Sequence, residues 1–199
     1  MKKFDLLIAG VGGQGVILAS DIIGEVALAA GYDVKKTDTL GMAQRGGSVL
    51  SNVRLARRIW SPLIKEGEVD IMLAFEKLEA ARWSHYLKPG AVVILNNHTL
   101  PPLSVNLGNE KYPADEEIAG ILRQRSERIY FVNGTRQVSE LGKIRTLNMY
   151  MLGCVSLFLP LNVSLWKDGI SQCIPSLIRQ INIAAFDRGR KEIRDVHFQ

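Results

Sequence analysis

The stretch that decides the fold is FDLLIAGVGGQGVILAS, residues 4–20. Residues 4–9 are apolar almost throughout, four of the six residues from 10 to 15 are glycine, and residues 14–30 place apolar side chains on a broad helical face. This order predicts a buried strand of a parallel sheet, a tight turn, and a helix that ends at Gly31. Because glycine costs backbone entropy where it is not needed, the cluster indicates that something approaches the backbone closely there.

The remainder of the chain continues the α/β pattern. Strands are predicted at residues 33–38, 70–75, 91–95 and 129–132, and a period of two predicts an extended segment that ends near Arg57. The expected helices are residues 76–86 and 115–124 and, after Gly134, residues 145–158, 166–173 and 176–190, with a turn at LKPG, residues 87–90. We therefore expect one α/β domain. A single Rossmann-like, open, mostly parallel sheet flanked by helices would occupy residues 1–134, and C-terminal helices in residues 135–199 would pack on it.

Composition and charge narrow the functional classes. The 199 residues are 47% hydrophobic and carry a net charge of +5. No apolar run reaches the roughly 18 residues of a membrane span, and no signal-peptide core follows the first lysines, so a cytoplasmic protein without a membrane segment is expected. The arginines have few interleaved aromatic residues and no nucleic-acid-binding motif, so solvated faces or an acidic partner surface explain them better than nucleic acid does.

Metal-ligating residue types form no site in the sequence. The cysteines, Cys154 and Cys173, lie apart in apolar surroundings, and the three histidines have no metal-ligand spacing. We expect two buried, reduced thiols, and no iron–sulfur cluster or zinc ion held by this chain.

The first glycine cluster admits more than one use. Gly10, Gly12 and Gly15 form G-x-G-x-x-G between a strand and a helix, a context that favours binding of an anion or phosphate. The alternative is that these glycines only allow tight strand–helix packing. A nicotinamide cofactor would need an acid about 20 residues further on, and Asp38 is near that place, but it leads into TLGMAQRGG and not into a helix. A nicotinamide-dependent reductase therefore stays a second interpretation.

The second glycine loop, GMAQRGGSV at residues 41–49, is more informative. It places Arg45 between Gln44 and the pair Gly46–Gly47, so a permanent cation extends from a bare backbone. The arginine fork suits carboxylates and phosphates, although a structural salt bridge is the alternative for any single arginine. We expect this loop at the carboxyl edge of the sheet beside the first loop, where open α/β sheets bind their ligands.

Five stretches together resemble one family. They are IAGVGGQGV, TDTLGMAQRGGSV, SPLI at residues 61–64, LKPGAVVILNN, and NMYMLGCV at residues 148–155. The chain resembles the gamma-type domain of the 2-oxoacid:ferredoxin oxidoreductases over nearly its entire length, and the form GMAQRGGSV favours the indolepyruvate type within that family.

The resemblance implies a reaction and a division of labour. An aryl 2-oxo acid is decarboxylated oxidatively with coenzyme A to an acyl-CoA, and the electrons pass to ferredoxin. Thiamine diphosphate and [4Fe–4S] clusters are expected in a large alpha subunit, because this sequence has no Gly-Asp-Gly…Asn-Asn signature and two cysteines cannot ligate a four-thiolate cluster. The chain would then be one part of a hetero-oligomer and inactive alone.

The resemblance also implies site residues. Gly10, Gly12, Gly13, Gln14 and Gly15 would form an anion nest with a neighbouring polar contact. The phosphates of coenzyme A are the most natural anion, and the thiamine diphosphate region across the interface is the alternative. Gln44, Arg45 and Gly46 would project toward the shared site or the partner. No metal ligand or catalytic residue is assigned, and Glu76, Asn96 and Asn97 are read as capping and turn residues. A non-catalytic module for a nucleotide-like ligand remains the third interpretation.

Overall fold

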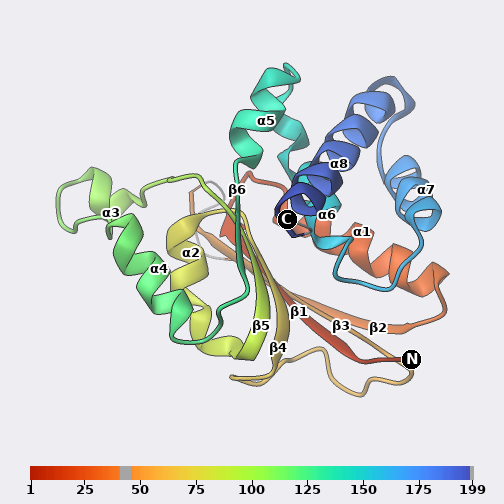
Figure 1. Cartoon of the computed structure of the whole chain (residues 1–199), viewed down its shortest axis with the longest axis horizontal. Coiled ribbons are helices and arrows are strands. Elements are labelled where there is room, and N and C mark those ends of the chain that lie inside the picture. The colour runs from red at the N-terminus through yellow and green to blue at the C-terminus, as the bar shows by residue number, and fades with distance from the viewer. Residues whose placement is uncertain (41–45, 198–199) are drawn as a thin grey trace.

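The computed structural model describes residues 1–40 and 46–197, in which one sheet lies between two layers of helices (Figure 1). The strands are β1 (Phe4–Val11), β2 (Asp33–Leu40), β3 (Ser48–Ala56), β4 (Val69–Ala74), β5 (Leu87–Asn96) and β6 (Ile129–Val132). Their order across the sheet is β2-β3-β1-β4-β5-β6.

The directions of the strands confirm a mostly parallel sheet. The pairs β1–β4, β4–β5 and β5–β6 are parallel, whereas β3 is antiparallel to both β1 and β2. The extended segment predicted up to Arg57 is therefore β3, and it lies between the first two strands. In a standard dinucleotide fold these two strands are direct neighbours.

Helices cover both faces of the sheet. They are α1 (Val16–Ala29), α2 (Lys77–Arg82), α3 (Leu103–Asn106), α4 (Asp115–Arg123), α5 (Gly134–Glu140), α6 (Leu147–Val155), α7 (Val163–Cys173) and α8 (Ser176–His197), with short 3-10 turns at Ser84–Tyr86 and Ile144–Thr146. Figure 1 shows α1, α6, α7 and α8 on one face and α2 and α4 on the other. None of the helices in this described part is long and apolar enough to cross a membrane.

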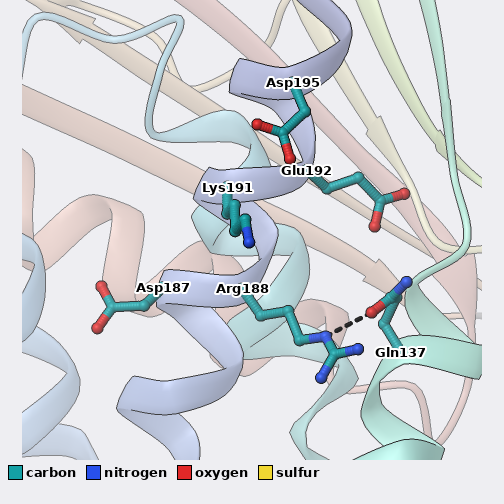
Figure 2. Close-up of a pocket in the computed structure, with 6 residues that line it drawn as sticks. All are labelled: Gln137, Asp187, Arg188, Lys191, Glu192 and Asp195. Atoms are coloured by element: carbon teal, nitrogen blue, oxygen red, sulfur yellow. Dashed lines mark hydrogen bonds between the residues drawn. The ribbon is translucent and has the colours of Figure 1, made fainter.

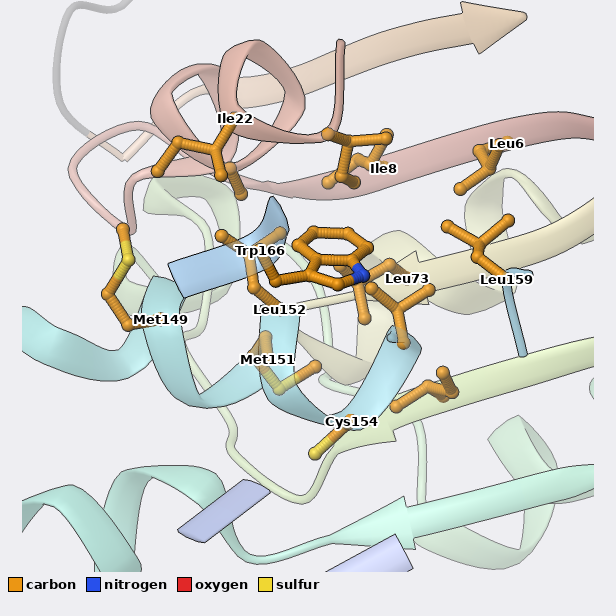
Figure 3. Packing of buried hydrophobic residues seen from close by; sticks show 14 of the residues in the cluster. Leu6, Ile8, Ile22, Leu73, Met149, Met151, Leu152, Cys154, Leu159 and Trp166 are labelled. Atoms are coloured by element: carbon orange, nitrogen blue, oxygen red, sulfur yellow. The ribbon is translucent and has the colours of Figure 1, made fainter. Parts of the chain in front are cut away.

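The alternation of β1 explains the two cores. Leu6 and Ile8 belong to one buried cluster, and Leu7 and Ala9 belong to the other, because successive strand residues point to opposite faces. Trp166 of α7 lies in the first cluster among side chains of β1, α1 and α6 (Figure 3). The C-terminal helices thus share a core with the sheet, as the sequence predicted.

Helices α6 and α8 cross at a pair of glycines. A Cβ atom on Gly153 would lie 2.0 Å from the Phe186 carbonyl oxygen, and one on Gly189 would lie 2.0 Å from the Tyr150 carbonyl oxygen. The two backbones are therefore in direct contact, and each glycine is required for the approach of the other helix.

Local predictions failed where a turn signal was misread or a helix was short. LKPG, predicted as a turn, is the beginning of β5: Gly90 has φ 72°, and the β4–β5 register shifts there, so the Pro-Gly pair forms a strand irregularity. The helix predicted at residues 76–86 ends at Arg82 and continues as a 3-10 turn. Helices α3 and α5 were not predicted, and Cys173 is half-buried, contrary to the expected full burial.

Both edge strands of the sheet disfavour pairing with a further strand. β2 carries four charged residues, and Lys36 pairs with Asp38 at 2.9 Å as well as with Asp21. β6, at the opposite edge, is only four residues long.

Candidate functional site

The first glycine loop joins β1 to α1 and meets several demands. A Cβ atom on Gly10 would lie 2.8 Å from the Gln14 Oε1 atom and 2.9 Å from the Phe75 Cβ atom, so tight packing accounts for this glycine. Gly13 and Gly15 have φ angles of 102° and 82°, which residues with a side chain rarely adopt. Gly15 is the N-cap of α1 without a side-chain cap, so backbone N–H groups of the first helical turn are available to an anion.

Gln14 braces this loop from inside. Its Oε1 atom accepts a hydrogen bond from the Val11 N–H group at 2.8 Å, and its Nε2 atom donates to the Phe75 carbonyl oxygen at 3.3 Å. The buried Asn96 side chain donates to the same carbonyl at 3.1 Å and accepts from the Thr135 N–H group at 3.2 Å. Both ends of the Gln14 amide are thus engaged within the protein, so a ligand would meet the backbone of this residue.

The end of the second glycine loop lies directly beside the first. The Gly12 N–H group donates to the Gly47 carbonyl oxygen at 2.9 Å, and the Gly46 N–H group lies 3.5 Å from the Gly12 carbonyl oxygen. Because β3 is antiparallel to β1, its first residue pairs with Val11 at the carboxyl edge of the sheet. Gln44 and Arg45 lie outside the described residues, so their contact with a ligand stays a prediction.

Asp38 is badly placed for a nicotinamide ribose. Its carboxylate accepts a hydrogen bond from the Ser51 hydroxyl at 2.5 Å and pairs with Lys36 at 2.9 Å. The whole of β3 separates Asp38 from β1 and its glycine loop. The arrangement therefore lacks the acid that a dinucleotide fold places next to its glycine turn.

A hollow of about 360 Å³ opens beside the first glycine loop. It is lined by Gly13, Gln14, Gly15, His98, Leu100, Thr135, Ile144, Arg145 and Leu147. The loop supplies backbone N–H groups, Thr135 a hydroxyl and His98 an imidazole, whereas Leu100 and Ile144 supply apolar walls. This mixture suits a ligand with an anionic group and an apolar portion.

Arg145 is the cation of this hollow. It is exposed, and across residues 1–40 and 46–197 it forms no ion pair. The sequence prediction read Arg145 as the first residue of a helix and did not assign it to the site. No local sequence pattern marks Arg145, because the packing of α6 against α1 brings it to the glycine loop. This packing is close: a Cβ atom on Gly15 would lie 2.8 Å from the Asn148 side chain of α6.

Glu76 supports the segment that carries His98 and Leu100. Its carboxylate caps α2 by accepting from the Glu79 N–H group at 3.0 Å, which confirms the capping interpretation, and it also accepts from the Leu100 N–H group at 3.1 Å. Burial and the hydrogen bond to Glu76 raise the pKa of Tyr112 above its ordinary value, so the phenol stays a donor. Asn97 is a surface residue that donates to Asn133 at 3.3 Å.

A larger hollow, of about 680 Å³, lies between α5 and α8 but is less suited to a ligand (Figure 2). Three of its charged groups, Asp187, Arg188 and Glu192, are already engaged within the protein. Arg188 contacts Gln137 and pairs with Glu140 at 2.6 Å, and Asp187 pairs with Lys167 at 2.8 Å. We therefore take the hollow at the glycine loop as the candidate site.

The chain is similar to known proteins over nearly its whole length. The family model described as pyruvate ferredoxin/flavodoxin oxidoreductase matches residues 5–192. The chain belongs to this family. Indolepyruvate oxidoreductase subunit IorB of Pyrococcus horikoshii is 34% identical to it over 98% of both chains, and the subunit of the same name from Archaeoglobus fulgidus is 35% identical over 94% of both.

Solved structures of oxoacid ferredoxin oxidoreductases have the same fold. The gamma subunit of keto/oxoacid ferredoxin oxidoreductase from Geobacter sulfurreducens superposes with a TM-score of 0.72 at 22% identity, covering 96% of this chain and 99% of that one. The 2-oxoglutarate:ferredoxin oxidoreductase from Magnetococcus marinus, solved with 2-oxoglutarate, coenzyme A and succinyl-CoA bound, gives 0.75 at 20% identity, covering 98% of this chain and 32% of that one. These relatives are enzymes or subunits of enzymes.

In this member of the oxidoreductase family, the described residues hold no group of three or more side chains suited to a metal ion. Cys154 is fully buried, and burial raises the pKa of its thiol well above the ordinary value, with the nearby Glu192 carboxylate acting in the same direction. Cys173 is half-buried, and burial raises the pKa of its thiol as well. Neither thiol is activated as a nucleophile.

Proposed function

We propose that this chain is the small subunit of an indolepyruvate-type 2-oxoacid:ferredoxin oxidoreductase. The complex oxidatively decarboxylates an aryl 2-oxo acid with coenzyme A, giving an acyl-CoA, CO₂ and reduced ferredoxin in the cytoplasm. Near-complete coverage of the indolepyruvate oxidoreductase subunits at 33–35% identity supports this choice within the family. A large alpha subunit supplies thiamine diphosphate and the [4Fe–4S] clusters, because this chain has only two cysteines and no thiamine signature.

In this proposal the chain contributes an anion-binding half-site. The observation that carries it is the placement of Arg145 beside an uncapped glycine turn in one hollow of about 360 Å³. Coenzyme A fits this set, since its phosphates suit the N–H groups of Gly13 and Gly15 and the Arg145 fork. When bound, coenzyme A supplies the thiol that accepts the acyl group. Leu100 and Ile144 would exclude water from its apolar portion.

The chemistry of this chain is binding and orientation. Gln14 accepts from the Val11 N–H group, and Gln14 and Asn96 both donate to the Phe75 carbonyl oxygen, which fixes the glycine turn. Its N–H groups would therefore meet an anion without reorganisation. His98 is held at the same hollow through its backbone, with its N–H group donating to the Asn96 carbonyl oxygen at 2.8 Å. A partner subunit that closes over this edge would complete the site.

The test uses the complex reconstituted from this chain and its large subunit. Arg145→Ala should raise KM for coenzyme A about tenfold, as expected for loss of one charge-assisted contact at an exposed site, and Arg145→Lys should restore part of it. Arg125→Ala is the matched control, because Arg125 is an exposed arginine that precedes β6 at the amino-terminal end of the parallel strands. Unchanged KM values for coenzyme A and the oxo acid in Arg145→Ala would remove this residue from the site.

A further inference from the structure

The loop between β3 and β4, residues 57–68, displays large apolar side chains to solvent. It runs along the amino-terminal edge of the parallel strands, below the sheet in Figure 1 and opposite the glycine turn. Trp60 is 80% exposed and Leu63 is 65% exposed. Tryptophan is rarely so accessible in a folded domain, so its display in this loop needs a reason. The loop also contains SPLI, residues 61–64, which the candidate site does not use.

Buried groups hold this loop in one conformation. The Arg54 guanidinium binds the fully buried Asp5 carboxylate, with Nε to Oδ1 at 2.9 Å, and donates to the Ser61 and Leu63 carbonyl oxygens at 3.1 and 2.8 Å. The Ile59 N–H group donates to Asp33 at 2.7 Å. An irregular segment fixed in this way presents Trp60 without a further ordering cost on binding.

The exposed surface of residues 57–65 is basic. The Arg58 guanidinium carbon lies 4.1 Å from the centre of the Trp60 ring, so cation and ring form one unit. Arg57, Arg58 and Lys65 are exposed and form no ion pair within the described ranges. A hollow of about 220 Å³ beside Trp60 is lined by Lys3, Arg54 and Arg58, among others. The acid in that hollow, Asp5, is neutralised by Arg54 and Lys3.

We infer that residues 57–65 are a docking anchor for an acidic surface of the large subunit, an inference that rests on the proposed function. Tryptophan and arginine are the residues that most often dominate protein–protein binding energy, and here they are stacked on a rigid support. Unpaired cations select an acidic partner. A second copy of this chain fits poorly, because a two-fold contact would bring the cations of Arg57, Arg58 and Lys65 face to face. A nucleic acid would be read by a series of aromatic residues, whereas this loop has one.

The experiment measures binding of the full chain to its purified large subunit by calorimetry. Trp60→Ala should raise the Kd at least about thirtyfold. Arg58→Glu should raise it at least about tenfold and should make the Kd less dependent on salt concentration. Leu177→Ala, which removes a side chain 94% exposed on α8, and Arg194→Glu are controls that should stay within twofold. All four melting temperatures should match that of the wild type, because these side chains are outside the core.

The possible outcomes distinguish the docking anchor from the proposed function. If the wild-type chain binds and the Kd of Trp60→Ala is within twofold of the wild-type value, the anchor is overturned and the proposed function stays intact. A concentration-dependent dimer of the chain alone, lost in Trp60→Ala, assigns the surface to a second copy and also overturns the anchor. Failure of the wild-type chain to bind the large subunit or to support its activity overturns both. Loss of affinity in the two loop variants alone, with folding unchanged, establishes it.

Discussion

Replacing Gly153 by alanine tests the backbone contact between α6 and α8. The new Cβ atom would lie 2.0 Å from the Phe186 carbonyl oxygen, and an ordinary contact begins at 3.4 Å, so α6 and α8 would have to separate by about 1.4 Å. Since the obstacle is backbone, no side-chain rotation relieves it. Overpacking of this kind costs about 3 kcal/mol at the upper end, from which the gain of about 1 kcal/mol for alanine over glycine in a helix is subtracted. The net loss is about 2 kcal/mol, or about 4–8 °C in Tm.

A matched glycine in another helix provides the control. Gly120 of α4 has no atom within 4 Å of the place its Cβ would occupy, so Gly120→Ala should stabilise the chain by about 0.5–1 kcal/mol. Thermal melting and urea unfolding of both variants should therefore shift in opposite directions. A Gly153→Ala variant as stable as Gly120→Ala would show that the two backbones are not in contact at this crossing.

Other expectations concern thiols, pH and the second loop. Cys173 should react with a disulfide reagent slowly and Cys154 only on unfolding, because burial raises both pKa values; rapid modification of two thiols in the native state would contradict this. The hydrogen bond from Ile59 lowers the pKa of Asp33 below its ordinary 3.8, so this carboxylate stabilises the fold above that pH, and its stabilisation is lost as the pH falls through the lower pKa of the folded state. Asp33→Asn should flatten the acid limb of the curve of stability against pH, and an unchanged limb would exclude a contribution from Asp33. In the complex, Arg45→Ala should raise the KM for coenzyme A or the oxo acid about tenfold, and Arg45→Lys should restore only part of the loss. Neither variant should change the Tm of the isolated chain. If Arg45→Ala unfolds the chain but leaves the kinetics of the surviving complex normal, Arg45 forms a structural salt bridge.

The sequence predicted elements whose signals are local. β1 and α1 lie within two residues of their predicted ranges, and β6 has the predicted bounds, because apolar runs and glycines mark them directly. LKPG misled because Pro-Gly usually forms a turn, whereas here the neighbouring strand absorbs the irregularity by a shift in register. The insertion of β3 between β1 and β2 depends on pairing between segments about 40 residues apart, which periodicity cannot reveal.

The candidate site was predictable in part. The glycine turn and its place at the carboxyl edge follow from strand–turn–helix order, since that order fixes the direction of the helix N-terminus. Arg145 and Thr135 reach the same hollow from more than 100 residues away through the packing of α5 and α6, and no spacing rule connects them to Gly13. The hydrogen bond from the Gln14 amide to the Phe75 carbonyl oxygen was not predictable, because the two residues are 61 positions apart in the sequence.

The two edge strands have a consequence for the chain before it assembles into the proposed complex. An open sheet offers a template on which another extended chain can add, and growth in that direction ends in fibres. The four charged residues of β2 place ammonium and carboxylate groups where an incoming strand would need to bury its own side chains. β6 offers such a strand only four residues for pairing. We therefore expect the unassembled subunit to stay dispersed, so that the cell can make it before, or in excess of, the large subunit.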